Sequence, residues 1–360
     1  MLLLQTQVTL VLLTLENYNM KSQQKKQLIA ALKTKVSTKV DVVELAKKLL
    51  NGNTTALSKA ITLVESNKRE DSLLAAELMR IILPHSGKSK RIGVSGVPGA
   101  GKSTFIEALG MSLIKSNLKV AVLAVDPSSE VGKGSILGDK TRMEQLSAKA
   151  NAFIRPSAAS GTLGGVARKT REAIYCCEAA GYDVVLIETV GVGQSETAVN
   201  SMVDFFLLIA ISGAGDELQG IKRGIMEMVH AVVINKADGE NIHKAKLAKT
   251  EVKRALHFYP QFSSGWSPET LVCSAIENTG IGEVWTLVES YFEKYAAYIK
   301  QNRKLQAKWW LKESIEEEVI AQFYMNKAVE KELPIIEKDV VEMKLSVSEA
   351  LLKLMALNKE

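Results

Sequence analysis

A phosphate-binding loop stands out in this 360-residue chain, where residues 96 to 104 read GVPGAGKST. The glycines permit backbone angles that a side chain forbids, and they let main-chain amides approach anionic oxygens. Lys102 is placed to reach the β- and γ-phosphates of a nucleotide, and the Ser103 hydroxyl suits a Mg²⁺ ligand. An apolar run at residues 92–94 precedes the loop and a helical pattern follows it, which is the context that the motif requires. The residues that we expect around the phosphates are Gly96, Val97, Pro98, Gly99, Ala100, Gly101, Lys102, Ser103 and Thr104.

A second motif, Asn235-Lys236-x-Asp238, indicates which base the nucleotide carries. The Asp238 carboxylate can accept hydrogen bonds from N1–H and the N2 amino group of guanine, a pair of donors that adenine lacks. Lys236 can lie along the base plane, and Asn235 can tie this loop to the phosphate loop. Ser274 and Ala275 follow a later strand and are placed to offer a main-chain N–H to guanine O6. Because unpaired buried polar groups make such a site reject adenine, the pattern predicts GTP as substrate and GDP as product.

Acidic residues at the ends of predicted strands indicate a magnesium site beside the phosphates. Asp126 ends an apolar run, and Glu188 stands three residues before Gly191, where GTPases usually carry an aspartate. Glu188 can hold Mg²⁺ through water, and the Gly191 amide can touch the γ-phosphate. Val192 occupies the position after the glycine where a water-orienting glutamine is common. Gln194 is the candidate for that role, but it stands three residues past Gly191 instead of next to it, so we expect intrinsic hydrolysis to be slow.

The polar loop at residues 213–222, reading GAGDELQGIK, follows another predicted strand. Loops at the carboxyl ends of such strands lie on the ligand side of a sheet. A solvated connection is one interpretation. The alternative is that a bound partner orders this loop and completes the catalytic site, with Lys222 stabilising charge or transmitting the partner's contact.

Strand and helix patterns alternate for nearly 200 residues, which predicts an α/β fold with a mostly parallel, doubly wound sheet. We assign residues 1–90 to an N-terminal segment and helical extension, 91–290 to the nucleotide domain, and 291–360 to a helical arm. A long charged helix is expected to reach about Met325, and Pro334 is expected to break the helical run. Trp309 and Trp310 on the arm favour a homodimer surface, with packing on the main domain as the alternative.

The composition excludes several function classes. Lys and Arg number 46 against 40 Asp and Glu, a mild excess spread along the chain, which argues against nucleic-acid binding and against a polybasic membrane patch. Three cysteines, Cys176, Cys177 and Cys273, form neither a disulfide framework nor a metal-binding spacing, as expected in a reducing cytoplasm.

The first 19 residues are apolar but interrupted by polar side chains, and they are too short to predict a membrane span. They also lack the basic start and the cleavage site of a signal peptide. Our hypothesis is that Met20 is the true start of the native protein. Intact-mass analysis tests it, and a mass that includes residues 1–19 contradicts it.

Seven runs together resemble the MeaB/ArgK/MMAA family of SIMIBI-class P-loop GTPases, the chaperones of cobalamin-dependent methylmalonyl-CoA mutase. They are GVPGAGKST, LAVDPSS, GSILGDKTRM, RPSAASGTLGGVARKTREA, ETVGVGQSE, GAGDELQGIKRGIME and NKAD, and they cover about residues 40–290. The resemblance implies a SIMIBI-type P-loop fold with a C-terminal dimerisation arm, and a GTPase that gates cobalamin loading and protection of an acyl-CoA mutase.

The resemblance also implies roles for individual segments. Asp126, Asp139 and Glu188 would be the acidic residues around Mg²⁺, together with Ser103. Residues 126–142 would contain switch I, residues 189–197 would form switch II, and residues 213–222 would form a third switch that faces the mutase.

Three other functions stay open at this point. A nickel-inserting GTPase would need His or Cys ligands near the switches, and the four histidines of the chain do not cluster. A small-molecule kinase would transfer phosphate to a bound acceptor, and a nucleotide-dependent scaffold would show no useful turnover. Release of phosphate from GTP without an acceptor separates hydrolysis from the last two. The sequence leaves open which acyl-CoA mutase is served.

Overall fold

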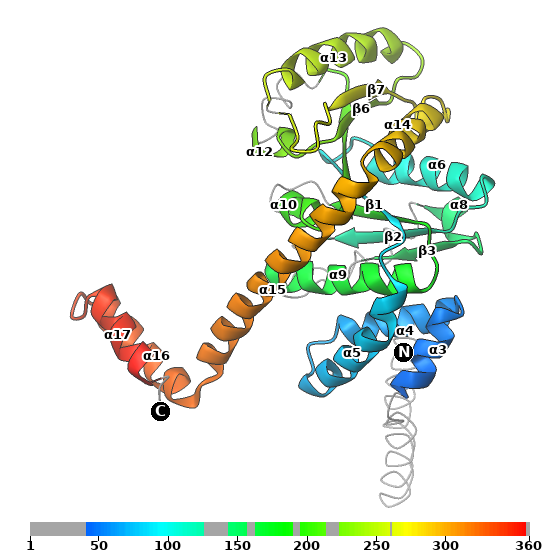
Figure 1. Cartoon of the computed structure of the whole chain (residues 1–360). Coiled ribbons are helices and arrows are strands. Elements are labelled where there is room, and N and C mark those ends of the chain that lie inside the picture. The colour runs from blue at the N-terminus through cyan, green and yellow to red at the C-terminus, as the bar shows by residue number, and fades with distance from the viewer. Residues whose placement is uncertain are drawn as a thin grey trace, which may run out of the picture.

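A sheet of seven parallel strands, in the order β3-β2-β4-β1-β5-β6-β7, forms the centre of the protein (Figure 1). The computed structural model describes residues 41–125, 143–156, 163–189, 195–213, 223–259 and 261–357. The strands are β1 (Lys90–Gly96), β2 (Val120–Val125), β3 (Ala152–Arg155), β4 (Val184–Thr189), β5 (Phe205–Ile211), β6 (Ala231–Asn235) and β7 (Glu269–Val272). Because all strands run the same way, their carboxyl ends share one edge of the sheet.

The strands are apolar on both faces because both faces are covered. On β5, Phe205, Leu207 and Ile209 enter one hydrophobic core, whereas Phe206 and Leu208 enter the other. Strands buried on both sides read as continuous apolar runs rather than as alternating ones, which explains the run FFLLIAI.

The sheet separates the two cores, and helices cover each of its faces (Figure 1). One face is covered by α6 (Lys102–Lys115), α8 (Glu144–Ser147) and α14 (Ile281–Lys294), and the other by α9 (Leu163–Ala179) and α10 (Ser195–Asn200). The short helix α12 (Arg223–Met226) precedes β6, and α13 (Asn241–Leu256) packs against β6 and β7. This doubly wound arrangement is the one that the sequence predicts.

Three N-terminal helices pack on the outer side of α9. They are α3 (Val42–Leu50), α4 (Thr54–Val64) and α5 (Arg69–Ile82), followed by the 3-10 turn η1 (Leu83–His85). Side-chain oxygens cap the first two helices: Asp41 accepts from the Glu44 amide at 3.0 Å, and Asn53 accepts from the Ala56 amide at 2.8 Å. Such caps satisfy amides that a helix N-terminus leaves without partners.

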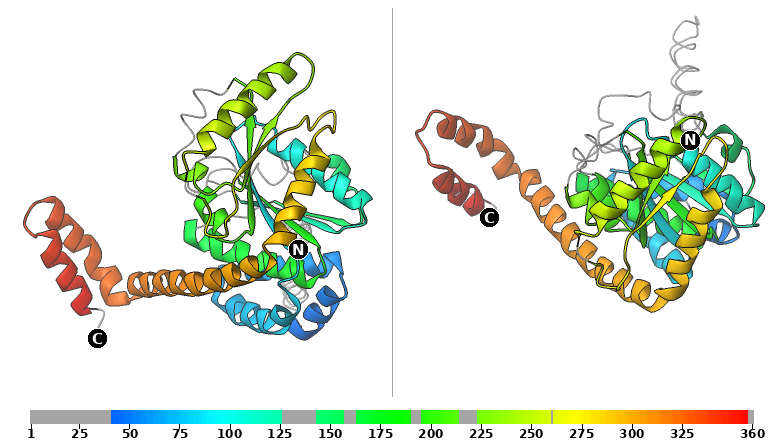
Figure 2. Two further views of the ribbon diagram at one scale, coloured as in Figure 1. Left: turned by 45° about the horizontal axis from the view of Figure 1, so that its top comes forward. Right: turned by 90° about the horizontal axis from the view of Figure 1, so that it is seen from above.

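A helical arm leaves the body at the C-terminal end of the chain (Figures 1 and 2). Its long helix α15 (Ala296–Met325) crosses the domain before it projects, and α16 (Lys327–Val341) and α17 (Val347–Leu357) fold back on each other at the tip. The tip has a small core of its own, made of Val329, Ile336, Ala350 and Leu354.

The two adjacent tryptophans of α15 have different surroundings. Trp310 is buried, and its indole N–H donates to the Ser201 carbonyl at 3.1 Å, whereas Trp309 is 47% exposed. Packing on the main domain therefore accounts for one ring of the pair and not for the other.

The expected break at Pro334 is wrong. Helix α16 continues through Pro334, and the helical run breaks instead at Asn326, whose side chain caps α16 by accepting from the Ala328 amide at 2.8 Å. Proline removes the hydrogen bond to the carbonyl four residues earlier, that of Glu330. Both Pro334 and Glu330 are exposed, so water can solvate that carbonyl and the helix tolerates the ring.

Within the ranges that the structure describes, no helix is both long and apolar enough to cross a bilayer. The division of the chain at residues 90 and 290 stays a prediction. Residues 1–40, on which the hypothesis about Met20 rests, lie outside the described ranges.

Candidate nucleotide-binding site

The phosphate loop connects β1 to α6 in a backbone conformation that requires glycine. Gly96 has φ 149° and Gly101 has φ 85°, both in the region that favours glycine. A Cβ on Gly96 would collide with the Ile209 carbonyl oxygen of the neighbouring strand β5. A Cβ on Gly101 would lie 2.7 Å from Asn235 Nδ2. The loop is therefore pressed between the ends of β5 and β6.

Lys102 folds back over this loop. Its Nζ donates to the carbonyl oxygens of Gly96 at 2.7 Å and Val97 at 3.2 Å. Val97 is half-buried, Pro98, Gly99 and Thr104 are exposed, and Ala100 is buried beneath them. The cation thus lies beside an accessible run of main-chain amides at the N-terminus of α6, where an anion is stabilised.

Ser103 and Glu188 meet between α6 and the end of β4. The Ser103 hydroxyl donates to Glu188 Oε1 at 2.9 Å, and the glutamate is buried. A hydroxyl and a carboxylate oxygen side by side are the hard ligands that Mg²⁺ prefers. The residues present therefore fit a magnesium ion at the place that the sequence predicts.

Asn235 joins the end of β6 to the phosphate loop. Its Nδ2 donates to the Ala100 carbonyl at 2.9 Å, and its Oδ1 accepts from the Ala275 amide at 3.1 Å. The Cys273 thiol lies 3.5 Å from the same oxygen and donates to it. Burial raises the pKa of Cys273 to about 12, so the thiol keeps its proton. This one side chain connects three loops at the carboxyl edge of the sheet.

Asp238 is held in place by the loop after β7. Its Oδ2 accepts from the Ser274 hydroxyl at 2.8 Å, and the same hydroxyl accepts from the Glu277 amide at 3.2 Å. Between the two motif residues, Lys236 takes φ 58° and the Ala237 amide donates to the Cys273 carbonyl at 3.0 Å. The two predicted base-reading segments therefore form one hydrogen-bonded unit.

The structure thus brings together the described part of the predicted site: residues 96–104, Glu188, residues 235–238 and residues 274–275. The other predicted site residues lie outside the described ranges, and they are Asp126, Asp139, Gly191, Gln194 and Lys222.

Sequence reasoning gave no individual role to three buried polar side chains next to this site, two of which lie in the predicted switch II. They are Ser95 at the end of β1, Thr189 at the end of β4, and Glu196 in the first turn of α10. Thr189 Oγ1 donates to Ser95 Oγ at 2.9 Å. A small hydroxyl side chain in an apolar strand is a weak signal. A glutamate in the run ETVGVGQSE was visible, but its burial was not.

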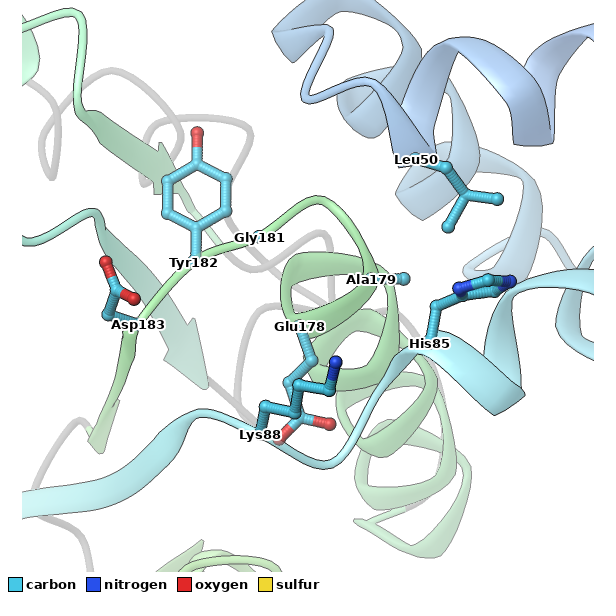
Figure 3. Close-up of a pocket in the computed structure, with 8 residues that line it drawn as sticks. All are labelled: Leu50, His85, Lys88, Glu178, Ala179, Gly181, Tyr182 and Asp183. Carbon is cyan, nitrogen blue, oxygen red and sulfur yellow. The ribbon is translucent and has the colours of Figure 1, made fainter.

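A separate cavity of about 320 Å³ lies at the amino edge of the sheet (Figure 3). Its lining includes His85, Lys88, Glu178 and Asp183, which come from the chain before β1, the end of α9 and the start of β4. Its two carboxylates have partners in the fold: Glu178 binds Arg91 at 2.8 Å, and Asp183 accepts from the Lys119 amide at 2.8 Å. The cavity is remote from the phosphate loop, which lies at the opposite edge.

Comparisons with known proteins agree with this geometry. The family model of the methylmalonyl Co-A mutase-associated GTPase MeaB matches residues 57–328. GTPase ArgK of Escherichia coli (strain K12) is 48% identical over 287 residues, covering 79% of this chain and 87% of that protein. The mitochondrial methylmalonic aciduria type A homolog of Mus musculus is 45% identical over 314 residues, covering 84% of this chain and 76% of that protein.

A solved structure extends the likeness to the fold. The crystal structure of a LAO/AO transport system kinase superposes with a TM-score of 0.70 at 37% identity, covering 90% of this chain and 99% of that one. Because the family model spans most of the chain, and because relatives named as GTPases are nearly half identical to it over most of its length, the chain belongs to the family of methylmalonyl-CoA mutase-associated GTPases and hydrolyses GTP.

Proposed function

We propose that this chain binds GTP with Mg²⁺ at the carboxyl edge of its sheet and uses hydrolysis to gate cobalamin loading and protection of methylmalonyl-CoA mutase. The observation that carries the nucleotide assignment is the hydrogen bond from Asn235 Nδ2 to the Ala100 carbonyl. It couples the loop that reads the base to the loop that holds the phosphates, so one nucleotide can span both.

In the proposed complex, the main-chain amides of residue 97 and of residues 99–102 would surround the β-phosphate, and Lys102 would exchange its two carbonyl partners for phosphate oxygens. Ser103 would hold Mg²⁺ directly and Glu188 would hold it through water, with Asp126 and Asp139 completing the acidic group. When bound, the ion would neutralise negative charge on the phosphates. The Gly191 amide would bind the γ-phosphate, and Gln194 would orient the attacking water.

At the base, Asp238 would accept from guanine N1–H and the N2 amino group while Ser274 holds its other oxygen. Lys236 would lie along the ring plane, and the main chain at Ser274 and Ala275 would face O6. Removing the negative charge changes the preferred base, because an amide can donate where a carboxylate cannot. We expect Asp238→Asn to favour XTP over GTP, since xanthine presents a carbonyl where guanine presents its amino group.

Binding titrations with GTP, XTP and ATP test this assignment. Ser264→Ala is a suitable control. Like the Ser274 hydroxyl, the Ser264 hydroxyl accepts from a main-chain amide in a loop, that of Trp266 at 3.2 Å, but Ser264 lies in the segment before β7. A variant at 238 that still prefers GTP would remove Asp238 from base recognition.

The assignment to the mutase is supported by the family description and by the name of the mouse relative. Intrinsic turnover is proposed to be slow, and the mutase is proposed to raise it at least about tenfold, which is about 1.4 kcal/mol of the barrier. Lys222→Ala should bind GTP normally and lose that rise. Single-turnover rates with and without cobalamin-loaded methylmalonyl-CoA mutase decide both points.

A kinase activity beside GTP hydrolysis is the second candidate, because the solved relative carries the name of a kinase. The two differ in what accepts the phosphoryl group. Phosphate released from GTP in the absence of any acceptor measures hydrolysis. Transfer of the γ-phosphoryl group to an added small-molecule acceptor would identify a kinase activity as well.

The arm is proposed to hold a homodimer. Most of the large apolar side chains that the described residues expose lie on the arm, including Val341 at 81%, Met343 at 94% and Leu352 at 72%. A second copy would bury the same surface on both partners. Light scattering at micromolar concentration tests this, and Leu352→Lys should give monomers. Leu73→Lys is the matched control, because Leu73 is 77% exposed on α5, away from the arm.

A further inference from the structure

A buried hydrogen-bonded trio lies directly behind the phosphate loop. Thr189 Oγ1 donates to Ser95 Oγ at 2.9 Å, and Ser95 Oγ lies 3.4 Å from Glu196 Oε1, to which it donates. None of the three side chains is more than 1% exposed. They come from the ends of two strands and from the first turn of α10, which the chain brings together over about 100 residues.

The trio and the magnesium-site pair hold β4 from opposite faces. Val94 of β1 pairs with Glu188 of β4, so the next residues on the two strands, Ser95 and Thr189, stand side by side. Because successive side chains alternate across a sheet, Glu188 points to the face of α6, where Ser103 donates to it. Thr189 points to the other face, toward α10. The backbone that carries Glu188 is therefore tied on both sides.

Helix α10 is pressed against β1 at the same place. A Cβ on Gly93 would lie 2.6 Å from the Phe206 ring of β5 and 3.1 Å from Val199 Cγ1 of α10, so the glycine leaves room for both side chains against β1. The close packing fixes the distance between the first turn of α10 and the strand that feeds the phosphate loop. Glu196 thus has little freedom to leave Ser95.

Burying the Glu196 carboxylate at this location costs free energy. Taking a carboxylate out of water is expensive, and a negative charge near the phosphate loop repels a polyphosphate. An apolar side chain on α10 would fill the same space without either effect. What the geometry does show is that Glu196 accepts from Ser95, which in turn accepts from Thr189, so its carboxylate sets the position of both hydroxyls.

We propose that Ser95 and Glu196 are positioning residues for GTP hydrolysis, acting through Thr189 on the adjacent Glu188. They fix the end of β4 relative to the phosphate loop, so that Glu188 reaches the water shell of the ion held by Ser103. Neither touches the nucleotide. The inference rests on the role proposed above for Glu188.

The test compares kcat and KM for GTP in Ser95→Ala, Thr189→Val and Glu196→Gln. Misplacement of a catalytic group by about 1 Å can lower a rate by up to about 100-fold. We expect kcat to fall at least about tenfold in each variant, while KM for GTP changes less than about threefold. The Mg²⁺ concentration for half-maximal binding of a fluorescent GDP analogue should rise in parallel. Because the three act as one unit, the double variant of Ser95 and Glu196 should be no slower than the slower single variant.

Ser89→Ala is the matched control. Ser89 lies just before β1 with 2% exposure, and its hydroxyl binds the Tyr182 carbonyl, at the end remote from the phosphates. Its variant should lose similar stability and keep kcat. Ser95→Cys, which keeps the size and a weak donor, serves if Ser95→Ala does not fold. Variants with kcat within about twofold of the Ser89 control would overturn the inference. A rise in KM for GTP with kcat unchanged would overturn it as well. An inactive wild-type chain would instead contradict the proposed site.

Discussion

Asn235 offers the sharpest single perturbation of the site, because three segments meet on its side chain. Asn235→Ala removes the donor to the Ala100 carbonyl at 2.9 Å and the acceptor of the Ala275 amide at 3.1 Å. It also removes the acceptor of the Cys273 thiol at 3.5 Å. The side chain is 2% exposed, so water does not replace these partners without rearrangement.

The expected loss of stability follows from the groups that the change leaves behind. Ala100 and Ala275 are both buried, and each would keep a main-chain polar group without its partner. A buried polar group without a partner costs about 1–3 kcal/mol, so the two together predict a loss of about 2–6 kcal/mol. For a chain of this size we expect the melting temperature to fall by roughly 5 °C or more.

The same substitution should also weaken the binding of guanine nucleotides in particular. Without Asn235, the base-reading loop and the phosphate loop are no longer fixed relative to each other, and binding must then order them. We expect the Kd for GDP to rise at least about tenfold, or about 1.4 kcal/mol, while the weak binding of ADP changes little.

Isothermal titration with GDP and ADP, together with thermal unfolding, measures both effects. Asn53→Ala is the control, because Asn53 caps α4 at 2.8 Å and lies far from the site. It should lower the melting temperature and leave the Kd for GDP unchanged. If Asn235→Ala binds GDP as the wild type does, then the Asn235 link does not join the two halves of the site.

Three further changes have expected outcomes. Gly96→Ala places a Cβ against the Ile209 carbonyl at φ 149°, and it should lower GDP affinity at least about tenfold in the same titration. Burial lowers the pKa of His230 to about 3 from 6.5, so the unfolded chain binds an extra proton between these values and stability falls as the pH drops through them. Urea unfolding should show a loss of about 1.5–2 kcal/mol from this ring between pH 6.5 and 5, and His230→Asn should flatten that slope. Arg303→Met leaves the buried carboxylate of Asp204 without its guanidinium at 2.6 Å, and it should cost about 3 kcal/mol in the same assay.

The sequence was sufficient to predict the sheet and the two halves of the site. Apolar runs of fixed length marked the strands, and a parallel sheet collects all their carboxyl ends at one edge. Glu188 and Asp238 therefore had to lie near the phosphate loop, although 50 residues separate them. Their hydrogen-bond partners in the structure are Ser103 and Ser274, and the roles of Glu188 and Asp238 stay predictions.

Side-chain contacts between elements far apart in the sequence could not be predicted from strand and helix patterns. Arg303 donates to Asp204 at 2.6 Å across 99 residues of sequence, and Arg91 binds Glu178 at 2.8 Å across 87. No local pattern identifies these pairs, because each depends on how a helix lies on the sheet. The predicted helix break at Pro334 was wrong for a related reason. The free-energy cost of a proline in a helix depends on whether water reaches the freed carbonyl, which is a property of the tertiary surface.

The contacts of α15 give the arm a physical link to the catalytic edge. Gln306 donates to the Val203 carbonyl at 3.0 Å and Trp310 to that of Ser201 at 3.1 Å, so α15 holds the loop at residues 201–204 that leaves α10. The first turn of the same short helix carries Glu196, which binds Ser95 behind the phosphate loop.

A partner that shifts α15 against this loop therefore also acts on the position of α10. By thermodynamic linkage, a nucleotide that favours one position of α10 must change the affinity for that partner by the same factor. We expect Trp310→Phe, which keeps a ring but removes the donor, to make the GTP and GDP forms of the chain bind the mutase more equally than the wild type does. Titration of the mutase with the GTP form and with the GDP form gives the ratio of the two Kd values for each chain. The same ratio in the variant and the wild type would show that α15 does not transmit the nucleotide state.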